Sequence, residues 1–316
     1  MSAGRLQIRE LLAGPPGSVH FVGIGGAGMA GLAFLLSRRG WRVSGCDAAG
    51  RSPRMDWLRK AGLDVRAQHD AAHAANADWM VRTAAVPEEH PEIRAARARQ
   101  LPVFTRGQTL AAWLDGFESL AVCGTHGKTT TAAMATHILR AAGLDPSHCI
   151  GGESATLDPA GAGRGALLVV EADESDGTLS EYAPDVMVLT NVEFDHADHF
   201  ADLAAVRACF EASARRARRG LVYNADDPGA RALGRGLPRA VSFGIAPEAE
   251  WRAAAIEEHA EGLAFDLWRG AGRLGAVRLP APGRHNVSNA LAACAASSFF
   301  GAGFEAMRAA WKRFRP

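Results

Sequence analysis

The chain has 316 residues, enough for one large or two ordinary domains, with a hydrophobic fraction of 48% and a charged fraction of 22%. Its formal net charge of +1 provides no overall basic field for nucleic acid, so we expect no nucleic-acid partner. The five cysteines are odd in number and form no Cys-x-x-Cys pair, which argues against a disulfide framework or a zinc site.

Signals for secretion or membrane insertion are not found in the sequence. Residues 1–17 contain no apolar core of signal-peptide length, and no apolar run is long enough to span a bilayer. These features predict a cytoplasmic protein with no membrane partner. Among the histidines, we expect His69, His73, His137 and His259 to be surface or core residues rather than ligands.

Apolar strands alternate with helices along the chain, which predicts parallel α/β units. In the first part we expect a strand at residues 19–23, then a glycine turn and a helix that ends near residue 39. A second strand at residues 42–45 and further βα repeats over residues 56–104 follow. A helix near residues 108–114 and a turn at Asp115 and Gly116 indicate a boundary. The prediction is a Rossmann-like parallel-sheet domain over residues 1–116.

A second α/β region follows over residues 117–316 and is predicted to be a P-loop-type central ATPase domain. We expect strands at residues 120–123, 166–170, 186–190 and 221–223. Helices are expected at residues 128–142, 203–219 and 286–300. Residues 241–279 are predicted to form strands of an antiparallel extension.

The first glycine turn consists of Gly23, Gly25, Gly26 and Gly28, between a strand and a helix. Glycines there let the backbone approach a pyrophosphate at the helix N-terminus. Asp47 ends the next strand, where it can meet a ribose hydroxyl. The pattern fits a UDP-sugar or a nicotinamide nucleotide equally well, so an oxidoreductase stays open, as does a tight turn without any ligand.

The second glycine turn carries more information because it ends in a lysine and threonines. The run consists of Gly124, Thr125, His126, Gly127, Lys128, Thr129 and Thr130. Backbone N–H groups in such a turn surround phosphate, the lysine adds a point charge, and a hydroxyl can ligate Mg²⁺. Val122 replaces the first glycine of the usual phosphate-loop pattern. The alternative interpretation is a surface turn that contains Gly-Lys-Thr by chance and binds no phosphate.

Acidic clusters follow the two strands expected next. Glu171, Asp173, Glu174 and Asp176 come after the first, and Asn191, Glu193, Asp195 and His196 come after the second. Since the carboxyl ends of parallel strands share one edge, both clusters are expected near the phosphate loop. Thr129 and Glu171 are candidates for one Mg²⁺ and His196 for a second; the alternative is solvated loops that cap helices.

Five motifs together resemble the Mur ligases. They are HFVGIGGAGMAGLA from His20, GTHGKTTT from Gly124, EADESDG from Glu171, TNVEFDH from Thr190 and GRHNVSNAL from Gly283, in family order. The resemblance implies that the first turn binds a UDP-sugar without redox chemistry and that the second binds ATP, with Asn191 at the same site. It implies catalytic roles for Lys128, Glu171 and His196, the last two as Mg²⁺ ligands, and nucleotide contacts from His285, Asn286 and Asn289.

The resemblance also implies a reaction: ATP-dependent ligation of an amine to UDP-N-acetylmuramic acid through an acyl phosphate. EADESDG is similar to the branch that adds L-alanine, whereas NVEFDHADHF is similar to ligases that join a recycled tripeptide to the same sugar. We favour L-alanine as the amine, because the first motif lies nearer the substrate, and keep the tripeptide as the alternative. Family members continue with a third domain, which is absent from this chain as it stands. A module that binds UDP-muramate or ATP without ligation is therefore a further alternative.

Overall fold

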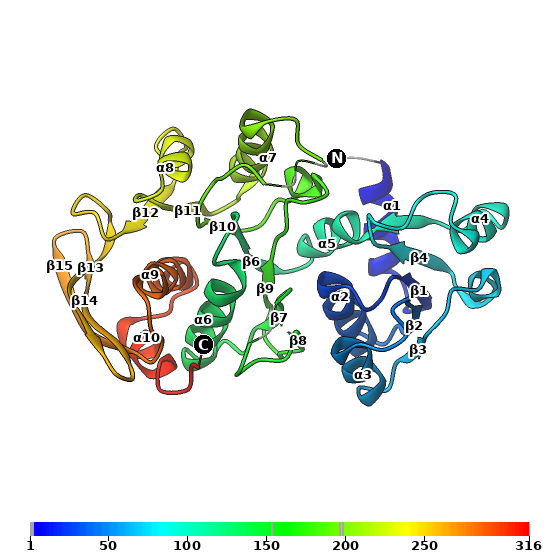
Figure 1. The fold of residues 1–316 in the computed structure, drawn as a ribbon, viewed down its shortest axis with the longest axis horizontal. Helices are drawn as coiled ribbons and strands as arrows, with labels where there is room; N and C mark the ends of the chain where they lie inside the picture. The colour runs from blue at the N-terminus through cyan, green and yellow to red at the C-terminus, as the bar shows by residue number, and fades with distance from the viewer. Residues whose placement is uncertain (1–2, 153, 196, 198, 316) are drawn as a thin grey trace. The chain divides into compact units, whose positions relative to one another are not determined.

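The computed structural model describes residues 3–152, 154–195, 197 and 199–315, and Figure 1 shows its helices and strands. The chain divides into two compact units. The first contains residues 1–116 together with 149–152 and 159–162, and the second contains residues 117–148, 153–158 and 163–316. The α/β class predicted from the sequence is confirmed.

The first unit is built on a five-stranded parallel sheet in the order β3-β2-β1-β4-β5. Its strands are β1 Ser18–Val22, β2 Arg42–Cys46, β3 Asp64–Arg66, β4 Trp79–Arg82 and β5 Val103–Thr105. The chain runs outward from β1 to β3 and then returns to β4 on the other side of β1. Such a reversal leaves a crevice at the carboxyl ends of the two central strands, where ligands of this fold class bind.

Five α-helices and one 3-10 helix complete the described part of the first unit. They are α1 Ala3–Ala13, α2 Ala27–Arg38, α3 Pro53–Lys60, α4 Pro91–Ala98, α5 Arg106–Leu114 and η1 Ala71–Asn76. Helix α5 begins with a capping box in which Thr105 and Gln108 exchange side-chain and backbone hydrogen bonds. The sequence analysis did not anticipate helix α1. The Arg5 guanidinium binds the Asp115 carboxylate at 2.7 Å, which attaches α1 to the end of α5.

The second unit contains most of the larger sheet, in the strand order β15-β14-β13-β12-β11-β10-β6-β9-β7. These strands are β6 Glu118–Cys123, β7 Ser147–Cys149, β9 Leu167–Glu171, β10 Val186–Leu189, β11 Gly220–Asn224, β12 Ala240–Gly244, β13 Trp251–His259, β14 Gly262–Arg269 and β15 Gly272–Leu279. Strand β8 Ala160–Gly161 belongs to the first unit. Strand β6 lies between β9 and β10 and pairs with both in parallel. The carboxyl ends of these three strands therefore meet at one edge.

The predicted antiparallel extension is right for β13, β14 and β15 and wrong for its first strand. Strand β12 pairs in parallel with β11, because helix α8 Pro228–Gly234 carries the chain back across the sheet between them. The remaining helices are α6 Lys128–Ala141, η2 Thr178–Glu181, α7 Leu203–Arg216, α9 Arg284–Ser298 and α10 Phe304–Ala310. Among the described residues, the helices are all too short or too polar to cross a membrane.

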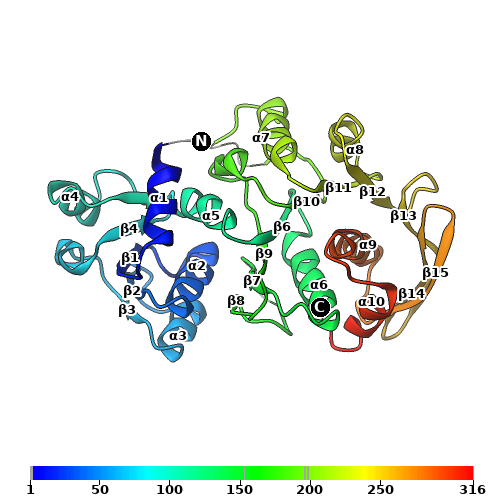
Figure 2. The ribbon, with the colours of Figure 1, turned by 180° about the vertical axis from the view of Figure 1, so that it is seen from behind.

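Helices α6 and α9 pack side by side in the second unit, as both views show (Figures 1 and 2). Helix α9 is rich in alanine, and Ala290, Ala292 and Ala293 are fully buried. Small side chains let the two helix backbones approach closely, and this brings the first turn of α9 to the start of α6.

Candidate active site

The loop between β6 and α6 needs glycine at two positions. Gly124 and Gly127 have φ angles of 123° and 80°, in the region that other residues avoid. A Cβ on Gly127 would lie 2.6 Å from Asn289 Oδ1, and one on Gly124 would lie 2.9 Å from the Asn191 carbonyl oxygen. Conformation and space together therefore exclude larger residues from this loop.

Residues at the end of β10 support the loop. The backbone N–H of His126 donates to Asn191 Oδ1 at 2.8 Å, and the Thr190 hydroxyl donates to the His126 carbonyl oxygen at 2.7 Å. The N–H of Glu193 donates to Thr125 Oγ1 at 3.1 Å. These bonds attach the loop to the end of β10, so Asn191 fixes the shape of the loop besides being an expected nucleotide contact.

Lys128 bends back over the loop at the first position of α6. Its Nζ donates to the carbonyl oxygens of Gly124 and Thr125 at 2.7 and 3.2 Å, and it lies 3.5 Å from Glu174 Oε2. The side chain of Glu174 is only 2% exposed and that of Lys128 is 14% exposed. The buried Glu174 carboxylate thus holds the Lys128 ammonium group beside the loop. A polyphosphate bound by the loop N–H groups would also contact this ammonium group.

Thr129 and Glu171 meet at the same edge of the sheet. The Thr129 hydroxyl donates to Glu171 Oε2 at 2.7 Å, across the gap between α6 and the end of β9. Hydroxyl and carboxylate oxygens so close together can occupy neighbouring positions around Mg²⁺, which prefers oxygen ligands. The expected convergence of Lys128, Thr129 and Glu171 is present, and their roles toward a metal stay predictions.

Other members of the acidic clusters serve local structure. Asp173 accepts the N–H of Ser175 and Asp176 accepts the N–H of Thr178, both at 3.0 Å. Such bonds stabilise turns, as in the alternative reading of these clusters. His196, the expected ligand of a second Mg²⁺, lies outside the described residues.

The start of α9 faces the loop. Thr131 Oγ1 donates to Asn289 Oδ1 at 3.3 Å, and Asn289 Nδ2 donates to Asn286 Oδ1 at 3.2 Å. Both asparagines are buried, whereas His285 is exposed. The structure therefore brings Asn289 next to Gly127 and joins it to Asn286. The nucleotide contacts of His285, Asn286 and Asn289 stay predictions.

The first glycine turn occupies the predicted place between β1 and α2. Gly23, with φ 83°, donates its N–H to the Cys46 carbonyl oxygen at 2.8 Å. The N–H of Gly25 donates to Asp47 Oδ2 at 3.0 Å, and Gly26 caps α2 without a side-chain bond. Asp47 therefore holds the turn in shape, and the N-terminus of α2 keeps its N–H groups for an anion.

One residue near this turn was missed by the sequence analysis. An ideal Cβ on Gly28 would lie 2.8 Å from Nη1 of Arg106, so this guanidinium packs directly on the first turn of α2. Arginine binds phosphate through two parallel hydrogen bonds, and its charge adds to the positive potential of the helix terminus. The contact joins residues far apart in sequence, and no local pattern marks it.

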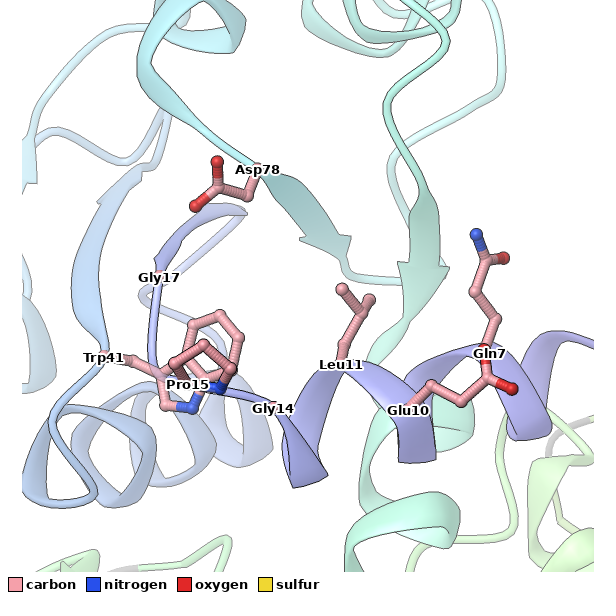
Figure 3. A pocket seen from close by; sticks show the side chains of 8 residues that line it. All are labelled: Gln7, Glu10, Leu11, Gly14, Pro15, Gly17, Trp41 and Asp78. Atoms are coloured by element: carbon pink, nitrogen blue, oxygen red, sulfur yellow. The ribbon is translucent and has the colours of Figure 1, made fainter.

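A hollow of about 460 Å³ in the first unit lies at the opposite edge of the sheet. Figure 3 shows Gln7, Glu10 and Leu11 of α1 on one side, with Trp41 and Asp78 across from them. Asp78 Oδ2 accepts the Ser18 N–H at 2.7 Å and its hydroxyl at 2.9 Å, which lowers the pKa of Asp78. Because this carboxylate already caps β1, the hollow is a poor candidate for the ligand site.

Comparison with known proteins shows the family of the chain. Residues 122–297 match the Mur ligase middle domain, and residues 18–118 match the Mur ligase family, catalytic domain. The chain belongs to the Mur ligase family. Ligases of this family depend on ATP.

Two curated relatives of this chain share one name. The UDP-N-acetylmuramate–L-alanine ligase of Symbiobacterium thermophilum is 44% identical over 92% of this chain and 62% of its own length. The enzyme of the same name from Kineococcus radiotolerans is 46% identical, over 90% and 62%. The chain therefore spans about three fifths of the length of these relatives.

Two solved Mur ligase structures resemble the fold closely. UDP-N-acetylmuramate:L-alanyl-γ-D-glutamyl-meso-diaminopimelate ligase from Neisseria meningitides has a TM-score of 0.86 at 32% identity, covering 96% of this chain and 99% of that one. UDP-N-acetylmuramate-alanine ligase MurC from Thermotoga maritima has a TM-score of 0.85 at 30% identity, covering 95% and 69%.

Proposed function

We propose that this chain binds ATP and UDP-N-acetylmuramic acid for ligation to L-alanine, in the synthesis of peptidoglycan precursors. The observation that carries the proposal is the grouping of Lys128, Thr129 and Glu171 at one sheet edge beside a glycine loop. The named relatives supply the substrate, since both of those described above are L-alanine ligases. A cytoplasmic location fits this proposal, because the reaction consumes ATP.

The residues of the chain have separate tasks in the proposed reaction. The muramic-acid carboxylate forms a bond to the γ-phosphorus and ADP leaves; the amine of alanine then attacks the acyl carbon and phosphate leaves. Lys128 and the loop N–H groups lower the repulsion between the carboxylate and the triphosphate. Glu174 is a positioning residue that holds Lys128, and the Asn286–Asn289 pair lies where the adenine is expected.

Mg²⁺ fits the oxygen donors at this edge. Thr129 and Glu171 would hold one ion, and His196 is the proposed ligand of a second. The metal would supply positive charge at the oxygens of the transferring phosphoryl group. At the other site, Gly23, Gly25, Gly26, Gly28 and Asp47 would hold the UDP group, with Arg106 beside them.

The Lys128→Ala variant tests the proposal. Calorimetry should show that ATP affinity falls about tenfold or more, because the ammonium–phosphate contact is lost while the helix remains. In the longest form of the protein that carries these units, alanine-dependent ADP formation should fall by roughly two orders of magnitude or more. Lys312→Ala is the matched control, and near-normal ligation by Lys128→Ala would remove the phosphate-loop assignment.

A ligase for recycled tripeptide is the second candidate, favoured by the similarity to the Neisseria enzyme along nearly its whole solved chain. Product analysis separates the two. Incubation with ATP, MgCl₂ and UDP-N-acetylmuramic acid should yield the L-alanyl product with alanine and little product with the tripeptide. Binding of both nucleotides without any amine-dependent phosphate release would instead support a non-catalytic binding module.

A further inference from the structure

A compact group of metal-binding side chains lies inside the first unit, apart from both glycine turns. It consists of His20 on β1, Cys46 at the end of β2, His73 on η1 and Glu92 at the start of α4. One donor atom from each residue lies within 4.8 Å of all the others. The four residues are between 0% and 9% exposed, so the group is closed to bulk water.

Four donor separations within this group, measured to both oxygens of Glu92, are close to those around a small tetrahedral ion. Zn–N bonds of about 2.0 Å and Zn–S bonds of about 2.3 Å place neighbouring donors roughly 3.3–3.6 Å apart. His20 Nε2 lies 3.4 Å from Cys46 Sγ and 3.0 Å from Glu92 Oε2. Cys46 Sγ lies 3.3 Å from Glu92 Oε2, and His73 Nδ1 lies 3.5 Å from Glu92 Oε1.

The chemistry of the donors also favours a divalent ion. A thiolate and a carboxylate contribute two negative charges and two neutral imidazoles contribute none, so one divalent cation balances the set. His73 Nδ1 is a buried nitrogen that makes no hydrogen bond within the described structure. A buried carboxylate such as Glu92 needs a positive partner, and a buried imidazole nitrogen needs either a hydrogen bond or a metal.

A surrounding layer fixes the orientation of these groups. His20 Nδ1 lies 2.8 Å from Ser44 Oγ, which leaves Nε2 directed at the group. Glu92 Oε1 accepts the N–H of Asp70 at 3.1 Å and lies 3.1 Å from His69 Nδ1. Metal-binding histidines and carboxylates in proteins have outer hydrogen bonds of this kind. Apolar residues complete the enclosure, among them Val22, Ala74, Met80 and Ile93.

We propose that His20, Cys46, His73 and Glu92 form a structural site for a borderline divalent metal, with Zn²⁺ the best fit. The ion joins η1 and α4 to the two strands that carry the first glycine turn and Asp47. Cys46 is the direct neighbour of Asp47, so the metal also fixes the backbone that supports the turn. The four ligands come from separated segments, which explains why cysteine spacing alone indicated no zinc site.

Metal analysis of the protein purified under reducing conditions tests the proposal. The expected result is about one zinc per chain, retained on gel filtration without nucleotide or Mg²⁺. After removal with a chelator, Co²⁺ should restore one equivalent and give the intense visible absorption of a tetrahedral site together with a thiolate band. If folded, reduced wild-type protein binds neither Zn²⁺ nor Co²⁺ in stoichiometric amount, the group is only a hydrogen-bonded network.

Variants locate the site. Cys46→Ser should abolish the thiolate band, and Glu92→Gln and His73→Gln should each lower zinc affinity roughly tenfold or more. Cys209→Ser and His259→Gln are matched controls outside the group and should bind zinc normally. If Cys46→Ser retains the wild-type cobalt spectrum, the proposal fails.

Stability provides a readout for variants that fold poorly. Adding Zn²⁺ to chelator-treated wild-type protein should raise its melting temperature, because the ion binds only the folded site. The isosteric Glu92→Gln variant should show a much smaller rise. An equal rise in both proteins would mean that zinc binds elsewhere and would overturn the assignment. Neither measurement depends on ligase activity, so the result stands apart from the proposed function.

Discussion

At the scale of single residues, the sequence predicted the site best where its chemistry is local. Lys128 and Thr129 belong to one short motif, and Glu171 was reached because parallel strands end at a common edge. The contact of Arg106 with Gly28 was not predictable, because nothing near either residue specifies the other. The same holds for the binding of Lys128 by Glu174, one of several acids in its cluster.

Glu171→Gln should separate metal binding from nucleotide binding. The amide keeps the size of the side chain and loses the charge that attracts Mg²⁺, so the ATP affinity gained on adding Mg²⁺ should fall about tenfold or more. Calorimetry with and without Mg²⁺ measures this gain. Asp173→Asn is the matched control, because Asp173 stabilises a turn with Ser175. An unchanged Mg²⁺ effect in Glu171→Gln would contradict the assigned ligand.

Arg106→Ala should weaken binding of the UDP-sugar and leave ATP binding unchanged. Loss of a charged hydrogen-bond donor to phosphate costs about 1.5–3 kcal/mol, roughly a tenfold to hundredfold loss of affinity. Separate titrations with UDP-N-acetylmuramic acid and ATP measure the two effects. Arg66→Ala serves as the control, since Arg66 forms an exposed pair with Asp64. Equal UDP-sugar affinity in both variants would show that Arg106 has only a packing role.

At the scale of elements, periodicity predicted most strands and the helices that follow them. It missed α1, whose anchor is the Arg5–Asp115 ion pair across more than a hundred residues, and it also missed α10. It also misassigned β12, because strand direction depends on the crossover through α8 and not on the strand itself. Elements defined by their own sequence were predicted, whereas those defined by tertiary partners were not.

Two glycines at the ends of α6 allow strain to be separated from close contact. Gly127 and Gly143 both have φ 80°, but a Cβ on Gly143 meets nothing within 4 Å, whereas one on Gly127 lies 2.6 Å from Asn289 Oδ1. Gly143→Ala should therefore cost about 1 kcal/mol of unfolding free energy and leave ATP binding intact. Gly127→Ala should cost more and reduce ATP affinity, because the loop and α9 must separate.

Urea unfolding and ATP titration of the two variants measure these effects. Equal losses in both variants would show that backbone conformation alone explains the glycine at position 127. Normal ATP binding by Gly127→Ala would mean that the contact between the loop and Asn289 has no part in the nucleotide site.

At the scale of the whole molecule, the proposed boundary at residue 116 coincides with a change of unit, but the units are not continuous segments. Residues 149–152 and 159–162 belong to the first unit, where an ideal Cβ on Gly31 would lie 2.5 Å from Cys149 Sγ. Such a contact depends on tertiary packing between α2 and a short segment far along the chain. A division of the sequence into consecutive segments cannot detect that residues 149–152 and 159–162 belong to the first unit.

Acid should weaken the second unit through two buried histidines. Burial lowers the pKa of His137 and of His148 from 6.5 to about 4, and the Arg140 guanidinium adds to the effect. In the fold His148 Nδ1 accepts from Arg140 Nη2 at 3.3 Å, so this nitrogen must stay unprotonated. The unfolded chain therefore binds more protons between about pH 4 and 6.5, and stability rises with pH across that window.

For each histidine, the free energy of unfolding should fall by about 2 kcal/mol between pH 7 and pH 5, with little change above pH 7. Urea unfolding at several pH values measures the slope, and His148→Gln should make it shallower by about half, since one of two titrating groups is removed. His259→Gln is the control, because the His259 side chain is 56% exposed and is not buried on folding as His137 and His148 are. If His148→Gln keeps the wild-type slope, carboxylates and not buried imidazoles determine the acid sensitivity of this unit.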